Sequence, residues 1–188
     1  MSSLTESTME TGIHIEGLSH HFGDKQALRD IDWVLPKKGI IGLVGPNGAG
    51  KTTLFSLIAG FLTLQTGQIS ILGESSPVSS NLMGRVGVMP QDAIFARDIS
   101  ILDQLLFLLS LEGVKGPEAE DRARTVMKLV GLETELHRGA SVLSHGMGKR
   151  LGVAQSILAH PEIVLLDEPT AGLDPANARQ IRTLMREL

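Results

Sequence analysis

The sequence predicts an α/β fold in which a parallel β-sheet is joined to a small N-terminal antiparallel β part and an inserted α-helical part. Three observations support this fold class. Residues 40–61 show a short apolar run, the glycine-rich loop GPNGAGKT and an amphipathic helical pattern, in that order. Residues 163–169, IVLLDEP, run from four apolar residues directly into two acids, as in a fully buried parallel strand. Between these stretches, residues 99–160 read as a helical lobe.

Composition narrows the class of protein. The chain has 188 residues, of which 42% are hydrophobic and 20% are charged, which is typical of a globular domain. The net charge of −4 gives no reason to expect nucleic-acid binding. The absence of cysteine excludes disulfides and thiolate metal sites. No apolar run is long enough to cross a bilayer and the amino terminus lacks an apolar signal region, so we expect a chain that is soluble by itself.

The expected domain organisation is one domain behind a short lead-in. Residues 1–11 are polar and are expected to be disordered, and residues 12–188 are expected to form the domain. Within the domain, residues 12–96 are assigned to the β part and the core that carries the glycine-rich loop. Residues 97–160 are assigned to the helical part, and residues 161–188 to the acidic strand, a turn and the start of an incomplete C-terminal part.

Short strands precede the glycine-rich loop. Apolar residues alternate with polar ones over residues 13–18 and 27–35, and Gly23 marks a turn between two antiparallel strands. Phe22 lies at the end of the first of them. Its ring either stacks on a purine base or belongs to the core, and spacing alone favours the core.

The loop GPNGAGKT matches the G-x-x-x-x-G-K-[ST] phosphate loop at every fixed position. Gly45, Gly48 and Gly50 allow backbone N–H groups to approach a phosphate closely. The helix that follows directs the positive end of its dipole to the same place. Lys51 is expected to reach the β- and γ-phosphates, and the Thr52 hydroxyl is expected to hold Mg²⁺.

The middle of the chain alternates predicted strands and helices. Strands are expected over residues 68–72 and 85–89, and helices over residues 100–111 and 117–130. Gln91 follows the second of these strands. A polar amide at the carboxyl end of a strand either faces a ligand or is an ordinary loop residue.

Two further stretches carry candidate chemistry. Ser144 begins a helix inside the glycine-rich segment LSHGMGKR, and it is either a helix cap or part of an anion site. Asp167, at the end of IVLLDEP, is expected to complete the Mg²⁺ shell with Thr52. Glu168 follows it and is placed to act as the general base on the attacking water.

With these residues assembled, the chain resembles the ATP-binding domain of an ATP-binding cassette (ABC) protein over residues 13–188. The resemblance implies that Phe22 stacks on adenine and that Gln91 is the Q-loop glutamine, with a catalytic role and a place among the Mg²⁺ ligands. IVLLDEP matches the Walker B strand, with Glu168 as the catalytic glutamate. GLDP matches the D-loop and places Asp174 at the contact with a partner subunit. The resemblance implies ATP binding by Phe22, Gly45, Pro46, Asn47, Gly48, Ala49, Gly50, Lys51, Thr52 and Thr53.

The segment LSHGM stands at the position of the family's LSGGQ signature, which contacts ATP across the dimer. It comprises Leu143, Ser144, His145, Gly146 and Met147. Ser144 and Gly146, the groups that would donate to the γ-phosphate, are kept. His145 replaces a glycine, where it is either a pH-sensitive group or a neutral bystander, and Met147 replaces the glutamine.

The implied cofactors are ATP and Mg²⁺, and the implied activity is ATP hydrolysis. The implied partners are a membrane permease subunit and a second ATP-binding subunit, identical or not, with no nucleic acid. The chain would then lie in the cytoplasm, peripheral to the inner face of the cell membrane. LSHGM and the short helical lobe are most similar to bacterial exporter-type ATPases with a separate permease. The alternative is a soluble ABC ATPase in translation or DNA repair, but the single phosphate loop and the lack of a heptad run or basic arm favour transport.

One family feature has no counterpart in the sequence. The family continues into a further strand that carries a switch histidine, and no histidine follows Glu168. In such folds that strand lies between the phosphate-loop strand and the Walker B strand. Its absence would leave buried backbone groups unpaired, at a cost of about 1–3 kcal/mol each. We therefore expect the 188-residue chain to be poorly folded or inactive alone, and a nucleotide-binding remnant without turnover is a further alternative.

Overall fold

The structure, a computed structural model, describes residues 10–187 and divides into two compact units, Met1–Leu82 and Met83–Leu188. Most of the expected lead-in lies outside the described residues. Its last residue, Thr11, is not part of a lead-in but the first residue of a strand, because it pairs with Pro36 beside a bond from the Lys37 N–H to the Glu10 carbonyl. The expected single domain, with divisions after residues 96 and 160, stays a prediction.

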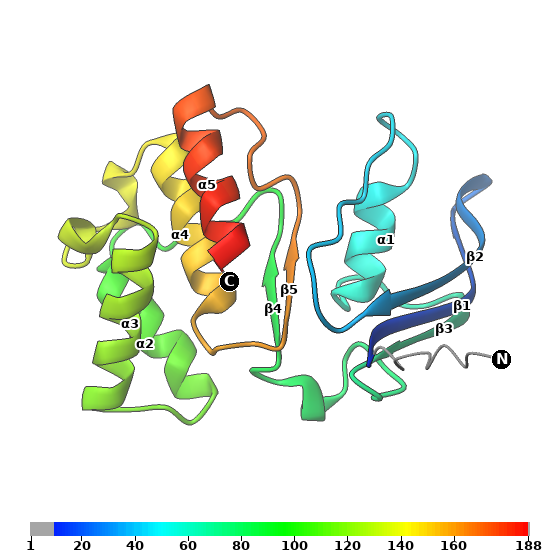
Figure 1. The fold of residues 1–188 in the computed structure, drawn as a ribbon, viewed down its shortest axis with the longest axis horizontal. Helices are drawn as coiled ribbons and strands as arrows, with labels where there is room; N and C mark the ends of the chain where they lie inside the picture. The colour runs from blue at the N-terminus through cyan, green and yellow to red at the C-terminus, as the bar shows by residue number, and fades with distance from the viewer. Residues whose placement is uncertain (1–9, 188) are drawn as a thin grey trace, which may run out of the picture. The chain divides into compact units, whose positions relative to one another are not determined.

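The first unit contains a three-stranded antiparallel sheet (Figure 1). Its strands are β1 (Thr11–Phe22), β2 (Lys25–Pro36) and β3 (Thr66–Ile71), in the order β2-β1-β3. The predicted N-terminal strands and the turn between them are confirmed, since β1 and β2 meet at Gly23, whose φ of 57° suits a tight turn. This unit ends with the short 3₁₀ helix η1 (Ser80–Leu82).

Helix α1 (Lys51–Ile58) follows the phosphate loop in the same unit. Its apolar stripe of Leu54, Leu57 and Ile58 is buried, whereas Phe61 lies beyond the helix and is exposed. The helix is therefore shorter than the apolar spacing predicted.

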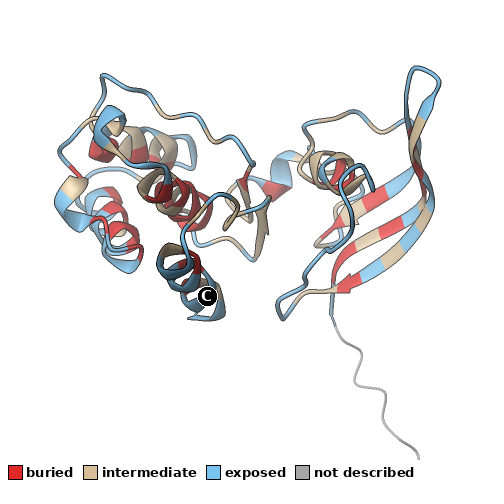
Figure 2. Cartoon of the chain, turned by 90° about the horizontal axis from the view of Figure 1, so that it is seen from above, coloured by how far each residue is buried: buried red, intermediate tan, exposed pale blue. Residues whose placement is uncertain are grey.

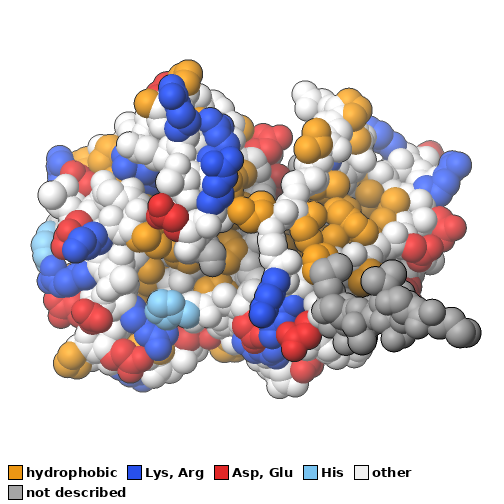
Figure 3. Space-filling model, in the orientation of Figure 1, with side chains coloured by type: hydrophobic (Ala, Val, Ile, Leu, Met, Phe, Trp, Pro, Cys, Tyr) orange, Lys and Arg blue, Asp and Glu red, His pale blue; other side chains and the backbone are white. Residues whose placement is uncertain are grey.

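The apolar run before the phosphate loop does not form the buried strand that its composition predicts. Residues 40–44 adopt no regular structure, and Ile40 and Val44 are 67% and 91% exposed. A buried strand needs partners on both edges, and no described strand pairs with these residues. Figure 3 shows hydrophobic side chains at the surface of this unit.

The second unit contains a two-stranded parallel sheet of β4 (Val86–Met89) and β5 (Ile163–Leu166). The two strands run in register from Val86 opposite Ile163 to Met89 opposite Leu166, which confirms the predicted parallel arrangement. All four residues of β5 are half-buried and not fully buried as the sequence predicted. Among the described residues β5 pairs along one edge only, so the other edge retains solvent access.

Helices make up the rest of the second unit, and Figure 2 shows their buried residues on the sides that face one another. Pro117 begins one predicted helix and Gly131 (φ 67°) ends it, and Ser100 caps the preceding one by accepting from the Asp103 N–H. No described helix is long and apolar enough to cross a membrane. The elements are α2 (Ile101–Leu111), α3 (Pro117–Leu129), η2 (Glu133–Glu135), η3 (Ala140–Val142), α4 (His145–Ile157) and α5 (Pro175–Glu187).

Candidate functional site

The phosphate loop enters α1 through two glycines with left-handed backbone. Gly48 has φ 82° and Gly50 has φ 87°. Gly50 occupies the N-cap position of α1, and no side chain caps the helix there. The first N–H groups of a helix have no intrahelical acceptor, so those of Lys51, Thr52 and Thr53 remain available to an anion. Local backbone geometry thus leaves these N–H groups open to a ligand, and phosphate binding by the loop stays a prediction.

Lys51 adds a positive charge to this loop. Its ammonium group donates to the carbonyl oxygens of Gly45 and Pro46, each at 2.9 Å. These bonds fold the side chain over its own loop, and a lysine ammonium carries a third donor that remains for a ligand. Asn47 and Ala49 are exposed on the loop, as is Thr52 on the first turn of the helix.

Phe22 is an exposed aromatic at the end of β1. Half of its surface is accessible (51%), so the core interpretation favoured by spacing is wrong. Its ring packs edge-on against His20, with 4.8 Å between ring centroids. Because His20 itself is buried, it anchors the Phe22 ring at one end of β1, while half of the phenylalanine surface stays accessible.

Gln91 makes its hydrogen bond to helix α4 (His145–Ile157) through its backbone carbonyl and not through its side chain. Two residues beyond β4, its carbonyl oxygen accepts a 2.7 Å hydrogen bond from the Lys149 ammonium, and its side chain is exposed. Lys149 lies on α4 and is only 8% exposed. None of the sequence motifs predicted a role for this residue. Its hydrogen-bond partner lies 58 residues away in the sequence, so no local pattern marks the pair.

The two acids after β5 differ in backbone conformation. The Asp167 N–H donates to the Met89 carbonyl at 2.9 Å and so extends the parallel ladder by one bond. Glu168 leaves the ladder with φ 46°, in the left-handed region that non-glycine residues rarely adopt. Such a residue costs about 1–3 kcal/mol, and strain of this kind concentrates at functional sites.

Ser144 caps helix α4, since its hydroxyl accepts a hydrogen bond from the Met147 N–H at 3.3 Å. Of the two residues that follow, His145 lies near the loop after β5 and Gly146 lies against the first turn of α5. The Nε2 atom of His145 lies 3.4 Å from the Ala171 carbonyl oxygen. Gly146 is buried, and a Cβ added to it would lie 3.3 Å from the Asn177 side chain.

Asp174 caps helix α5. Its carboxylate accepts from the backbone N–H groups of Ala176 and Asn177 and from the Asn177 side-chain amide. These bonds favour the ionised form, and the side-chain bond from Asn177 contributes most to holding the pKa of Asp174 below its usual range. Because Asn177 also packs on Gly146, the structure brings the predicted signature and D-loop residues together.

The lowered pKa predicts a pH-dependent contribution of Asp174 to stability. Its carboxylate stabilises the folded chain above its unfolded pKa of about 3.9, and this contribution is lost as the pH falls through the lower folded value. We expect wild type to exceed Asp174→Asn in melting temperature near pH 7, with a difference that shrinks below about pH 4. Thermal unfolding of both proteins over this range measures the difference. A difference that is constant with pH would contradict the assignment.

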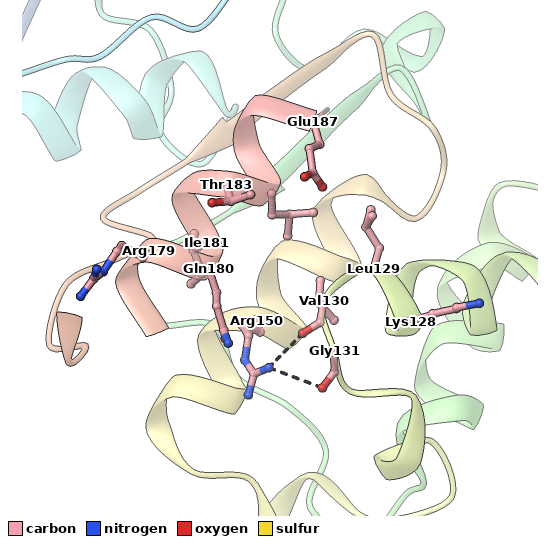
Figure 4. A pocket seen from close by; sticks show the side chains of 11 residues that line it. Lys128, Leu129, Val130, Gly131, Arg150, Arg179, Gln180, Ile181, Thr183 and Glu187 are labelled. Atoms are coloured by element: carbon pink, nitrogen blue, oxygen red, sulfur yellow. Dashed lines mark hydrogen bonds between the residues drawn. The ribbon is translucent and has the colours of Figure 1, made fainter. Parts of the chain in front are cut away.

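A cavity in the second unit is separate from the predicted site residues. It has a volume of about 410 Å³ and lies among α3, α4 and α5. Figure 4 shows Arg150 in its wall, donating to the carbonyls of Val130 and Gly131 at the end of α3, while Lys128 and Arg179 point away in different directions. The cations do not converge, so this cavity gives no anion site.

A model of the ABC transporter family matches residues 28–171. The uncharacterized ABC transporter ATP-binding protein YdbJ of Bacillus subtilis is 37% identical over 94% of this chain and 56% of its own length. The Nod factor export ATP-binding protein I of Sinorhizobium fredii is 32% identical over 100% of this chain and 55% of its own. An import protein, the spermidine/putrescine import ATP-binding protein PotA of Bacteroides fragilis, is 31% identical over 94% of this chain and 38% of its own.

The solved structures agree with the sequence comparison. A dimeric ATP-binding cassette in a post-hydrolysis state, bound to ADP and Pi, superposes with a TM-score of 0.83 at 21% identity, over 94% of this chain and 82% of that one. The fold is thus the α/β fold of an ATP-binding cassette, as the sequence predicted. The chain belongs to the ABC transporter family. It spans little more than half the length of YdbJ and of the Nod factor export protein.

Proposed function

We propose that this chain is the ATP-binding and ATP-hydrolysing part of a subunit that energises an export-type ABC transporter through nucleotide-driven dimerisation. One observation carries the proposal: a helix start without a side-chain cap, entered through left-handed Gly48 and Gly50, has the Lys51 ammonium folded over it. This arrangement offers backbone donors, a helix dipole and a cation to one polyphosphate.

The proposed metal is Mg²⁺, because the residues that the sequence motifs suggest as ligands carry hard oxygen donors. They are the Thr52 hydroxyl, the Asp167 carboxylate and the Gln91 amide oxygen, and Mg²⁺ favours oxygen ligands together with substrate phosphates. When bound, Mg²⁺ would neutralise charge on the phosphates. Glu168 would accept a proton from the attacking water, and Phe22 would stack on the adenine.

The signature residues support dimerisation. Ser144 and Gly146 lie at the start of α4, where the helix dipole favours an anion. A second ATP-binding subunit would bring its own nucleotide to this helix start, and Asp174 lies next to it through Asn177. Nucleotide occupancy would thereby be linked to association of two subunits.

A membrane permease subunit is the proposed second partner, and the protein would then sit at the inner face of the cell membrane. Exposed apolar side chains on the second unit offer a docking surface: Ile94 is 93% exposed, Phe107 62% and Leu111 58%. Met89, at the end of β4, is 1% exposed and belongs to the core, so it is not part of this surface. Export agrees with the variant LSHGM and with the Nod factor relative, although PotA is named for import.

The proposal is tested by nucleotide binding and copurification with the full-length protein that carries this chain. We expect Mg²⁺-dependent binding of a fluorescent ATP analogue, loss of binding in Lys51→Met, and copurification of a polytopic membrane protein from detergent extracts. Lys115→Met, which changes a lysine outside the phosphate loop, is the matched control. Recovery with ribosomes, or binding that ignores Lys51→Met, would contradict the proposal.

A further inference from the structure

Helix α4 lies against residues 89–95, the segment that contains Gln91, and at Gly152 it leaves little room for a larger side chain. We call these residues the glutamine segment. A Cβ added to Gly152 would lie 3.2–3.4 Å from three atoms of the Met89 side chain, and one added to Gly148 would lie 3.8 Å from the Phe95 ring. Because residues four apart share one face of a helix, both glycines allow the same side of α4 to contact the glutamine segment.

Between these two glycines, Lys149 donates to the Gln91 carbonyl oxygen at 2.7 Å. Lys149 forms no ion pair among the described residues, so this carbonyl is its only hydrogen-bond acceptor there. A buried ammonium is costly to leave without a partner, and a hydrogen bond from a charged donor is stronger than one between neutral groups. The bond therefore resists separation of the helix from the glutamine segment.

We propose that Lys149 is a positioning residue that fixes the glutamine segment to helix α4, so that Gln91 and the signature residues at the start of the helix move as one body. This inference rests on the proposed function, because it assigns a mechanical role within the proposed ATPase. The three contacts cover one continuous stretch of α4, from Gly148 to Gly152, that begins one turn after Ser144. A displacement at the signature therefore reaches the Gln91 backbone through a short and rigid path.

The role is specific to a long cationic side chain. Methionine has similar length but no N–H donor, and arginine keeps both charge and donors. A purely packing role for Lys149 would be served by methionine, whereas the proposed role would be restored only by arginine. The pair Lys149→Met and Lys149→Arg separates the two roles, with Lys128→Met as a control at an exposed lysine on α3.

The first measurement is amide hydrogen exchange by mass spectrometry on the full-length protein. We expect Lys149→Met to accelerate exchange about tenfold in peptides covering residues 90–96, with no change in β1–β3. Lys149→Arg is expected to restore most of the protection, and Lys128→Met is expected to match wild type. Unchanged exchange at residues 90–96, or equal acceleration throughout the second unit, would overturn the inference.

The second measurement is steady-state ATP hydrolysis by the same proteins. We expect Lys149→Met to lower kcat about tenfold with little change in the KM for ATP, because the phosphate loop is untouched, and Lys149→Arg to recover it. If Lys149→Met does not fold, Lys149→Leu, which also lacks an N–H donor, replaces it with the same expected localised exchange. A wild-type protein that does not hydrolyse ATP would refute the proposed function, while the exchange data would still decide whether Lys149 holds the glutamine segment.

Discussion

Replacing Glu168 with glutamine is expected to lower ATP turnover by about 10²–10⁴-fold while nucleotide binding persists. The amide keeps the size and position of the side chain but cannot accept a proton from water. The measurement is single-turnover hydrolysis by the full-length protein together with equilibrium binding of ATP. Retained ATP with abolished turnover would assign the general base, and unchanged turnover would remove Glu168 from that role.

A glycine at position 168 provides the matched comparison. Glu168→Gly is equally unable to act as a base, but it relieves the left-handed backbone at φ 46°. We expect Glu168→Gly to have a free energy of unfolding up to about 1 kcal/mol larger than that of Glu168→Gln. Its melting temperature should be higher accordingly. If glycine brings no gain over glutamine, position 168 carries no strain.

Gly50→Ala is expected to reduce both stability and ATP affinity more than the same change at Gly48. Both glycines have positive φ, so each substitution costs about 1–2 kcal/mol of backbone strain. Only at Gly50 does the added Cβ collide with β2, at 2.7 Å from the Ala27 carbonyl oxygen and 2.8 Å from Leu28. Overpacking of this kind costs about 1–3 kcal/mol more.

The affinity loss follows from the same collision. To relieve it, the start of α1 must shift, and this displaces the N–H groups of Lys51 and Thr52 that would face phosphate. Each hydrogen bond to a charged group contributes about 1.5–3 kcal/mol, so we expect at least about a tenfold weaker Kd. Chemical unfolding and ATP titration of both variants measure the two effects. Equal effects at Gly48 and Gly50 would show that the contact with β2 is unimportant.

Much of the fold follows from local sequence signals. Alternating apolar residues and the turn at Gly23 predicted β1 and β2, and Ser100, Pro117 and Gly131 marked where helices begin or end. These signals act within a few residues, so a single chain is enough to read them.

The errors concern residues whose environment depends on distant partners. Residues 40–44 have a strand-like composition but no described strand beside them, and β5 is half-buried because one of its edges is unpaired. The spacing of apolar residues did not decide whether Phe22 is a core residue or an exposed ring, because exposure depends on which other parts of the chain cover the residue.

The sequence predicted the residue types of the candidate site better than it predicted the contacts between those residues. The phosphate loop and the capping role of Ser144 follow from motifs. The bond from Lys149 to the Gln91 backbone joins positions 58 residues apart and leaves no local periodic signature. The same holds for the packing of Gly146 on Asn177. Metal and nucleotide roles of Gln91, Asp167 and Glu168 remain predictions.

Gly87, in the middle of β4, shows how closely β4 and α4 pack in the second unit. A Cβ built there would overlap the Ser156 carbonyl oxygen, at 1.7 Å, so α4 rests directly on bare backbone. This backbone contact has no layer of side chains that could be compressed. The helix α4 therefore cannot move toward β4 or tilt without displacing the strand as well. Gly87 therefore fixes the distance between α4 and β4, and any rotation of α4 must occur about this contact.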